Sequence, residues 1–334
     1  MRRVRVFLPL LLLVSLSIPA GASSPAVVSE HVAFEVSNPL DRDHKYVVRG
    51  VLVRPVGCSS SVLVGEHGVS YGAWAWDFPF RPETYSMARA LAARGYSTLA
   101  LDRLGYGTSD RPNGYTITVE LYADIARQVV DQLRAGAYEG RSPTAFRHVG
   151  IIGHWGGTEV VELVAGAYRN VDVVIPTAYL HAPWASTDWL IKSWVAGDFV
   201  RSAQSDYEYR GASPEARASE FYNLSMADPD VVALDNELAN PAPSGEIYSL
   251  SAQPSRWVLG NIRVPVLLVL AEKDSVFPVE DGPKELALFT GSNDKTLHVI
   301  PESGHTFMLH PNAPGFHDAL ADWLDARQQA MPKC

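Results

Sequence analysis

Hydrophobic positions along this chain fall into short runs that are separated by longer amphipathic stretches. The first two runs alternate apolar and polar residues, which is typical of an antiparallel pair at the edge of a sheet. The later runs are more continuously apolar, as buried parallel strands are. The pattern therefore predicts an α/β fold with a mostly parallel, eight-stranded sheet. We expect its strands at residues 31–36, 46–54, 61–64, 97–101, 148–152, 171–178, 264–270 and 296–300.

The stretches between the strands have helical spacing. Leu121, Ile125, Val129 and Leu133 follow one another at intervals of four residues, which puts them on one face of a helix that packs on the core. Because helices alternate with strands, they are expected to cover both faces of the sheet. The predicted helices span residues 85–94, 119–134, 158–168, 283–289 and 315–329.

Between residues 184 and 260 this alternation gives way to clustered aromatic residues, among them Trp184 and Trp189, and to proline breaks. The segment follows the sixth strand, so it lies above the carboxyl ends of the sheet, where open α/β folds bind ligands. We interpret residues 184–260 as a helical cap, and residues 23–183 and 261–334 as the core. An ordinary long connection with a small core of its own is the alternative.

The first 22 residues have the three parts of a secretory signal peptide. Three arginines precede an apolar run from about residue 6 to residue 18, and residues 20–22 form an A-x-A cleavage pattern. The run is shorter than the roughly 20 residues of a membrane span, although an uncleaved anchor is the alternative. No later stretch is long enough to cross a bilayer. We therefore expect a secreted protein, either extracellular or periplasmic.

Charge and cysteine content narrow the choice of partners. The net charge of −9 becomes −12 when the three arginines of the signal peptide are removed, and an acidic exterior repels nucleic acid and anionic lipid. Cys58 and Cys334 are the two cysteines. Export allows them to form a bridge, but two free thiols or a pairing between chains fit the sequence equally well. The oligomeric state cannot be inferred from the sequence.

One short motif bears on the chemistry. Residues 153–157 read Gly-His-Trp-Gly-Gly, which has the spacing of a hydrolase nucleophile elbow, G-x-S-x-G. The elbow is a sharp strand-to-helix turn, so the positions two before and two after its apex must be nearly free of side chain. Only Trp155 satisfies this rule as the apex. An indole is no nucleophile, so Trp155 cannot form an acyl-enzyme.

With three further landmarks in order, the chain resembles the α/β-hydrolase superfamily over nearly all of the mature sequence. The landmarks are His67-Gly68, the glycine-rich segment at residues 102–109, and the pair Asp274 and His305 near the end. The resemblance is strongest to exported esterase- or lipase-like members with G-H-S-x-G and a cap after the sixth strand. Epoxide hydrolases and haloalkane dehalogenases instead carry G-H-D-W-G. Substitution of the central residue explains the motif better than deletion, because Gly153 and Gly157 keep the required separation.

This resemblance implies roles for specific residues. Asp274 corresponds to the family acid, with Glu272 as the weaker candidate, and His305 corresponds to the general base. The backbone amides of Val69 and Gly156 correspond to the oxyanion hole. Tyr71, Trp184 and Trp189 are the candidates for contact with a substrate.

Other polar residues of these motifs are predicted to be structural. They are the hydroxyls of Ser70 and Ser109, the imidazoles of His67 and His154, and His310, which we expect at the surface beside Pro311. The sequence contains no zinc or calcium motif, and Gly105 and Gly107 lack the third glycine of a dinucleotide fingerprint. We therefore expect neither a metal nor a cofactor.

Three functions remain open at this stage. The resemblance implies a small, apolar, ester-like substrate, but covalent ester hydrolysis is not available with Trp155 at the apex. The first possibility is an enzyme that uses Asp274 and His305 for acid–base chemistry without a covalent intermediate. The second is a non-catalytic, ligand-binding relative. The third is a nucleophile-substituted variant of a working serine esterase.

Overall fold

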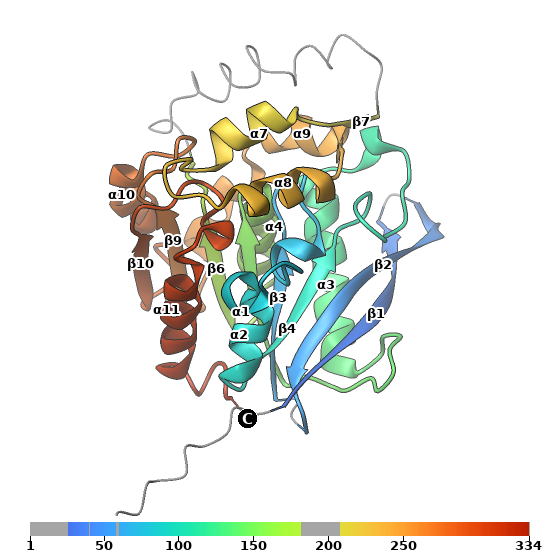
Figure 1. Cartoon of the computed structure of the whole chain (residues 1–334). Coiled ribbons are helices and arrows are strands. Elements are labelled where there is room, and N and C mark those ends of the chain that lie inside the picture. Colours follow the sequence, from blue (N-terminus) through green and yellow to red (C-terminus); the bar gives the residue numbers. More distant parts are fainter. Residues whose placement is uncertain (1–25, 40, 58–59, 182–207, 334) are drawn as a thin grey trace, which may run out of the picture.

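The computed structural model describes residues 26–39, 41–57, 60–181 and 208–333. It confirms the α/β-hydrolase fold, with one eight-stranded sheet in the order β1-β2-β4-β3-β5-β6-β9-β10 (Figure 1). All eight predicted strands are present. They are β1 (Val27–Asn38), β2 (Asp41–Pro55), β3 (Ser61–Glu66), β4 (Ser97–Asp102), β5 (His148–His154), β6 (Val173–Thr177), β9 (Val266–Ala271) and β10 (Lys295–Ile300).

Strand direction follows the hydrophobic pattern. β2 runs antiparallel to β1 and to β4, whereas all the neighbouring strands from β4 to β10 are parallel. Exposed and buried residues alternate along β1, as expected for a strand with one solvated face. Every residue of β3, β4 and β9 is buried, because helices cover both faces of the parallel part.

The helices form two layers. α3 and α4 pack together on one face of the sheet, and α2 and α11 pack together on the other (Figure 1). The predicted helix at residues 85–94 is divided by Ser86, whose hydroxyl caps the second piece by accepting from the Arg89 amide. The helices of the core are α1 (Pro82–Tyr85), α2 (Met87–Ala93), α3 (Val119–Ala135), α4 (Gly156–Leu163) with a π-helical turn (Val164–Tyr168), α10 (Gly282–Leu288) and α11 (Ala313–Asp325).

A layer of short elements between β6 and β9 lies across the carboxyl ends of the strands, at the top of Figure 1. It contains β7 (Tyr209–Arg210), α7 (Pro214–Phe221), α8 (Pro229–Leu238), β8 (Ala242–Pro243), α9 (Ser244–Leu250) and η4 (Pro254–Trp257). This is the helical cap that the sequence predicts after the sixth strand. The exact limits of the cap remain a prediction, and Trp184, Trp189, Cys58 and Cys334 lie outside the described residues.

Among the helices described, none is long and apolar enough to cross a membrane.

The turn from β5 into α4 is the tightest part of this framework. A Cβ atom on Gly153 would lie 2.2 Å from the carbonyl oxygen of Gly157. A Cβ atom on Gly157 would lie 2.2 Å from the carbonyl oxygen of Glu66 in β3. Because both neighbours are backbone atoms, no side-chain rotation could relieve either contact.

We therefore predict that Gly157→Ala strongly destabilises the protein, by at least about 3 kcal/mol, because overpacking against backbone forces the strand and helix apart. Urea unfolding measures this free energy. The matched control is Gly315→Ala in α11, where an added Cβ meets nothing within 4 Å. There alanine should be neutral or add up to about 1 kcal/mol. Equal stabilities of the two variants would contradict the close approach at the turn.

Candidate active site

Three loops at the carboxyl edge of the sheet bring the predicted site residues together. Trp155 follows β5, Asp274 lies three residues after β9, and His305 lies in the loop after β10. Because these strands are parallel, their carboxyl ends share one edge, so residues distant in sequence meet there.

Asp274 and His305 form a hydrogen-bonded pair. The imidazole Nδ1 of His305 lies 2.9 Å from Oδ2 of Asp274, and the two side chains are 0% and 1% exposed. The other carboxylate oxygen of Asp274 accepts from the backbone N–H groups of Val276 (2.7 Å) and Phe277 (3.1 Å). These bonds hold the carboxylate in place, so it can orient the His305 ring by accepting from Nδ1. The alternative acid, Glu272, instead bonds the Glu302 amide and Lys273.

Trp155 stands at the apex of the turn. Its backbone has φ 49° and ψ −115°, a conformation that side chains rarely adopt and that a sharp strand-to-helix turn requires. Its N–H donates to the Thr177 carbonyl (3.0 Å), and its carbonyl accepts from the Thr158 amide (2.8 Å). The backbone geometry of an elbow is therefore present, with the indole of Trp155 at its apex.

The indole ring closes over the acid–base pair. Its centroid lies 5.4 Å from that of the His305 ring, edge to face, and 5.5 Å from that of Phe221 in α7. Trp155 is 3% exposed and His305 is fully buried. Neither Trp155 Nε1 nor His305 Nε2 has a hydrogen-bond partner among the described residues. Buried polar atoms without partners cost free energy.

Val69 and Gly156, the predicted oxyanion residues, lie side by side. A Cβ atom on Gly156 would be 3.2 Å from a methyl carbon of Val69. In the described part of the chain, no hydrogen bond is found from either amide. However, Oε1 of Glu246 in α9 would lie 3.3 Å from the same Cβ position. A carboxylate therefore stands next to the amide that would stabilise an oxyanion.

Arg103 neutralises that carboxylate. Its Nη2 lies 2.7 Å from Glu246 Oε1, with both side chains at most 1% exposed, and it also donates to the Gly68 carbonyl at 3.3 Å. The Tyr106 hydroxyl donates to the other oxygen of Glu246. Burial raises the pKa of the neighbouring Glu66 to about 7. This network joins α9 to the loop that carries Val69. The motif at residues 102–109 indicated a turn, but not the ionic role of Arg103.

The remaining histidines of the motifs are buried. Nε2 of His67 accepts from the Arg103 amide at 3.2 Å, while its Nδ1 bonds the Gly68 carbonyl at 2.8 Å. Burial lowers the pKa values of His67 and His154, so both are neutral. The prediction that His310 lies at the surface was wrong. It is fully buried, because its Nε2 accepts from the amides of Asn223 and Gly304, both at 3.1 Å.

Tyr71 lies beside the site and is fully buried. Its hydroxyl bonds Thr306 Oγ1 at 2.6 Å, and its ring lies 6.0 Å from that of His154. Two serines near the site are engaged elsewhere. The Ser70 hydroxyl bonds Arg217, and the Ser109 hydroxyl donates to the Asp102 carbonyl at 2.6 Å. Neither is in contact with His305, so the structure offers no reason to make either a nucleophile.

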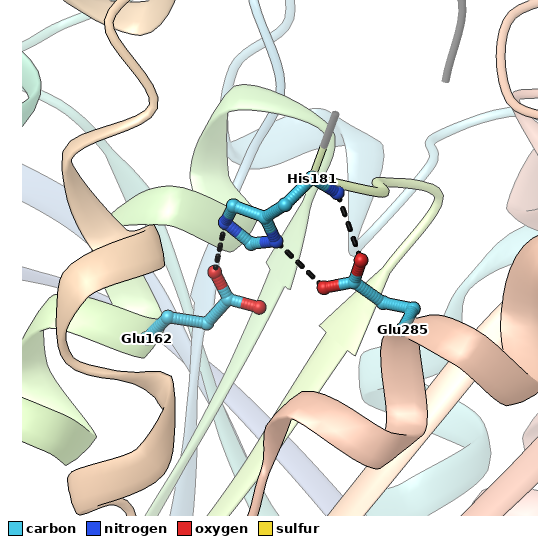
Figure 2. A group of neighbouring side chains, drawn as sticks. All are labelled: Glu162, His181 and Glu285. Atoms are coloured by element: carbon cyan, nitrogen blue, oxygen red, sulfur yellow. Dashed lines mark hydrogen bonds and ion pairs between the residues drawn. The ribbon is translucent and has the colours of Figure 1, made fainter. Parts of the chain in front are cut away.

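A second polar cluster, which the sequence analysis missed, includes a glutamate of α4, the helix that follows Trp155; Figure 2 shows three members of the cluster. We call Glu162, His181, Ser255 and Glu285 the buried ionic cluster. His181 Nδ1 lies 2.6 Å from Glu285 Oε1, and His181 Nε2 lies 2.8 Å from Ser255 Oγ and 3.3 Å from Glu162 Oε2. Spacing along the chain gives no sign of it, because its members are far apart. The sequence offered one sign of the cluster, which is the acidic residue Glu162 within the mostly apolar predicted helix at residues 158–168.

The cluster contains donors that suit a metal, since Glu162, His181 and Glu285 offer ligand atoms within 4.8 Å of one another. However, the two carboxylates face opposite nitrogens of the ring (Figure 2). Each ring nitrogen already has a carboxylate oxygen close to it, at 3.3 Å and 2.6 Å, so a doubly protonated imidazole satisfies both carboxylates directly. Burial opposes this charge, but Glu162 and Glu285 outweigh it and raise the pKa of His181 well above its usual value.

The order Ser255–His181–Glu285 also resembles a serine-hydrolase triad in its distances. Its electrostatics differ, because a protonated His181 cannot accept a proton from Ser255. The Ser255 hydroxyl instead donates to Glu162 at 2.7 Å, and Ser255 is fully buried. The arrangement is that of an ionic network and not of an active nucleophile.

Comparison with known proteins identifies the family. A model described as "Alpha/beta hydrolase family" matches residues 62–314, so the chain belongs to the α/β-hydrolase family. No curated protein matches it in sequence.

Several solved structures share the fold. A thermophilic esterase from Thermogutta terrifontis has 17% identity and a TM-score of 0.66, over 88% of this chain and 98% of that one. The α/β-hydrolase GrgF from Penicillium sp. sh18 has 18% identity and a TM-score of 0.62, over 90% and 99%. The enol-lactonase from Burkholderia xenovorans LB400 has 13% identity and a TM-score of 0.63, over 87% and 100%. At these identities the likeness establishes the fold alone.

The strained apex gives a test of the site geometry. In ordinary helix and strand positions alanine is more stable than glycine by up to about 1 kcal/mol. At position 155, where φ is 49°, we predict the reverse order. Trp155→Gly should be more stable than Trp155→Ala by about 1 kcal/mol, because glycine tolerates this conformation. The cavities that the two variants leave differ by one methyl group, so thermal unfolding reports mainly the backbone effect. A more stable alanine variant would place the residue outside this conformation.

Proposed function

We propose that this protein is an α/β-hydrolase in which Trp155 has replaced the nucleophile, so that covalent ester hydrolysis is lost or very weak. The acid–base pair of Asp274 and His305 is retained, and any remaining activity is non-covalent proton transfer on a small, apolar, ester-like substrate. The observation that carries the proposal is the indole of Trp155 at the strained apex, packed edge to face on His305.

Chemistry at the site supports this proposal. A neutral imidazole whose Nδ1–H donates to Asp274 leaves Nε2 of His305 as an acceptor, and in that form it can act as a base. The indole N–H of Trp155 is a donor and has no lone pair for attack. Together they suit a water molecule, whose oxygen accepts from the indole and whose proton passes to His305. Loss of the nucleophile in a serine hydrolase costs about a millionfold in turnover, so this route is slow.

The choice of an ester-like substrate rests on family membership and on the neighbours, two of which are described as an esterase and an enol-lactonase. An apolar substrate fits the aromatic residues around the site, among them Tyr71 and Phe221. Trp184 and Trp189 remain candidates for the same role.

We also propose that residues 1–22 direct export and are removed. N-terminal sequencing of the secreted protein tests this.

A second candidate function is non-catalytic binding of an apolar ligand. The burial of His305 beneath Trp155 and Phe221 favours it, because a general base without access to a substrate performs no chemistry. In this case the ligand occupies the site that the indole borders, and turnover is absent.

The decisive comparison is between the native chain and Trp155→Ser. We expect a fluorophosphonate probe and a short-chain chromogenic ester to give labelling and turnover in the serine variant, because its hydroxyl would stand at the apex beside His305. The native chain should give neither above the level of His305→Ala. Mass spectrometry locates the labelled residue.

Two controls make this comparison specific. Trp155→Ser combined with His305→Ala should lose labelling, whereas Trp155→Ser combined with His298→Ala should keep it, because His298 lies within β10 and outside the site. Labelling of the native chain on any residue would refute the loss of a nucleophile. Labelling only after insertion of a serine between His154 and Trp155 would show that the motif arose by deletion.

The binding function makes a different prediction. Titration with hydrophobic esters that are not turned over should change the tryptophan fluorescence of the native chain with a saturating curve. Trp155→Phe should bind the same ligands with a smaller signal, because the ring is kept but its indole is lost. An unchanged signal in that variant would place the ligand elsewhere.

A further inference from the structure

The buried ionic cluster joins four parts of the chain that are far apart in sequence. His181 lies just after β6, Glu162 is on α4, Ser255 is on η4, and Glu285 is on α10. In addition to its ring contacts, His181 donates its backbone N–H to Glu285 Oε2 at 2.8 Å. The cluster therefore ties the segment after β6 and the η4 turn to α4 and α10, and Figure 2 shows the contacts of His181 with Glu162 and Glu285.

Negative charge exceeds positive charge around the His181 ring. Besides Glu162 and Glu285, α4 contributes Glu159, whose carboxylate accepts from the Ser255 amide at 2.9 Å and from the Tyr179 hydroxyl at 2.5 Å. All three glutamates are at most 1% exposed.

Within the described parts of these elements, no lysine or arginine balances the cluster. Arg256 of η4 is exposed, and Lys284 of α10 pairs with Asp281 at 2.6 Å. Among the described residues, a protonated His181 is therefore the cation that contacts Glu162 and Glu285.

The cluster also borders the candidate active site. α4 begins directly after Trp155 and carries both Glu159 and Glu162. The ring of Tyr179 lies 5.1 Å from that of Phe277, and the Phe277 amide donates to Asp274. Movement of the cluster would therefore reach the elbow helix and the loop of the acid.

We propose that the buried ionic cluster is a proton-dependent latch. While His181 is protonated, it holds the end of β6 and the η4 turn against α4 and α10. Loss of that proton leaves uncompensated carboxylates in contact, and the two segments separate from the helices. This proposal does not depend on the function proposed above.

The direction of the pH effect follows from three groups. The pKa of His181 is raised, so its contribution is complete below about pH 6.5 and is lost as the pH rises through the higher value in the folded protein. Burial raises the pKa of Glu162 to about 7 and raises that of Glu159. The folded state therefore keeps protons that the open state releases, and all three groups make the latch weaker as the pH rises.

Hydrogen exchange on the native chain tests the latch. Protection factors, corrected for the intrinsic rate, are measured for residues 178–181 and 253–259 between pH 6 and pH 9. We expect protection of both segments to fall by up to tenfold per pH unit above about pH 6.5, as release of one proton requires. Residues 148–152 of β5, which lie outside the cluster, should show no such fall.

Three variants complete the test. Glu162→Gln should flatten the pH profile, because it removes one titrating group and one partner of His181. His181→Gln should abolish the pH dependence above pH 7. His317→Gln should leave it unchanged, because burial lowers the pKa of that histidine to about 4. A flat profile in the native chain, or a native profile in His181→Gln, would overturn the latch. One equivalent of Zn²⁺ that removed the pH dependence would show that a metal is the cation.

Discussion

The close passage of backbone at the β5–α4 turn is the constraint on which the rest of the site depends. Gly153, Gly157 and Glu66 approach so nearly that no Cβ atom fits between them. This contact sets where α4 starts, forces positive φ on Trp155 and aims that side chain at the loop of His305. The position of the indole is therefore a consequence of the turn and not of a favourable aromatic contact.

The same constraint explains why polar groups remain unsatisfied nearby. An elbow presents its apex to a histidine, so a residue without a hydroxyl leaves Nε2 of His305 without its usual partner. Burial makes that loss costly. Such a cost, retained beside an intact Asp274–His305 hydrogen bond, is characteristic of a functional site, where local stability is given up for chemistry or binding.

Much of the fold and part of the site could be predicted from the sequence. Strand and helix positions follow from local periodicity, and Trp155, Asp274 and His305 follow from motif order. Contacts between distant residues could not be predicted. Glu246 lies next to Gly156, and His181 contacts Glu285, although the residues of each pair are far apart in the sequence. These contacts form only when the chain folds, so spacing along the sequence does not indicate them. His310 was misplaced because Pro311 indicates a surface turn, whereas the amides that bind this histidine belong to other loops.

Electrostatics next to the elbow are set by a buried ion pair. The carboxylate of Glu246 lies next to Gly156. Its negative charge is balanced by the ion pair with Arg103, and the Tyr106 hydroxyl donates a hydrogen bond to it. An oxyanion held by the Gly156 amide would lie close to the carboxylate of Glu246.

Retention of the two turn glycines has an evolutionary consequence. The tryptophan codon differs from one serine codon at a single nucleotide, and the surrounding backbone already accepts a small residue at the apex. A lineage carrying this gene is thus one point mutation from a hydroxyl beside His305.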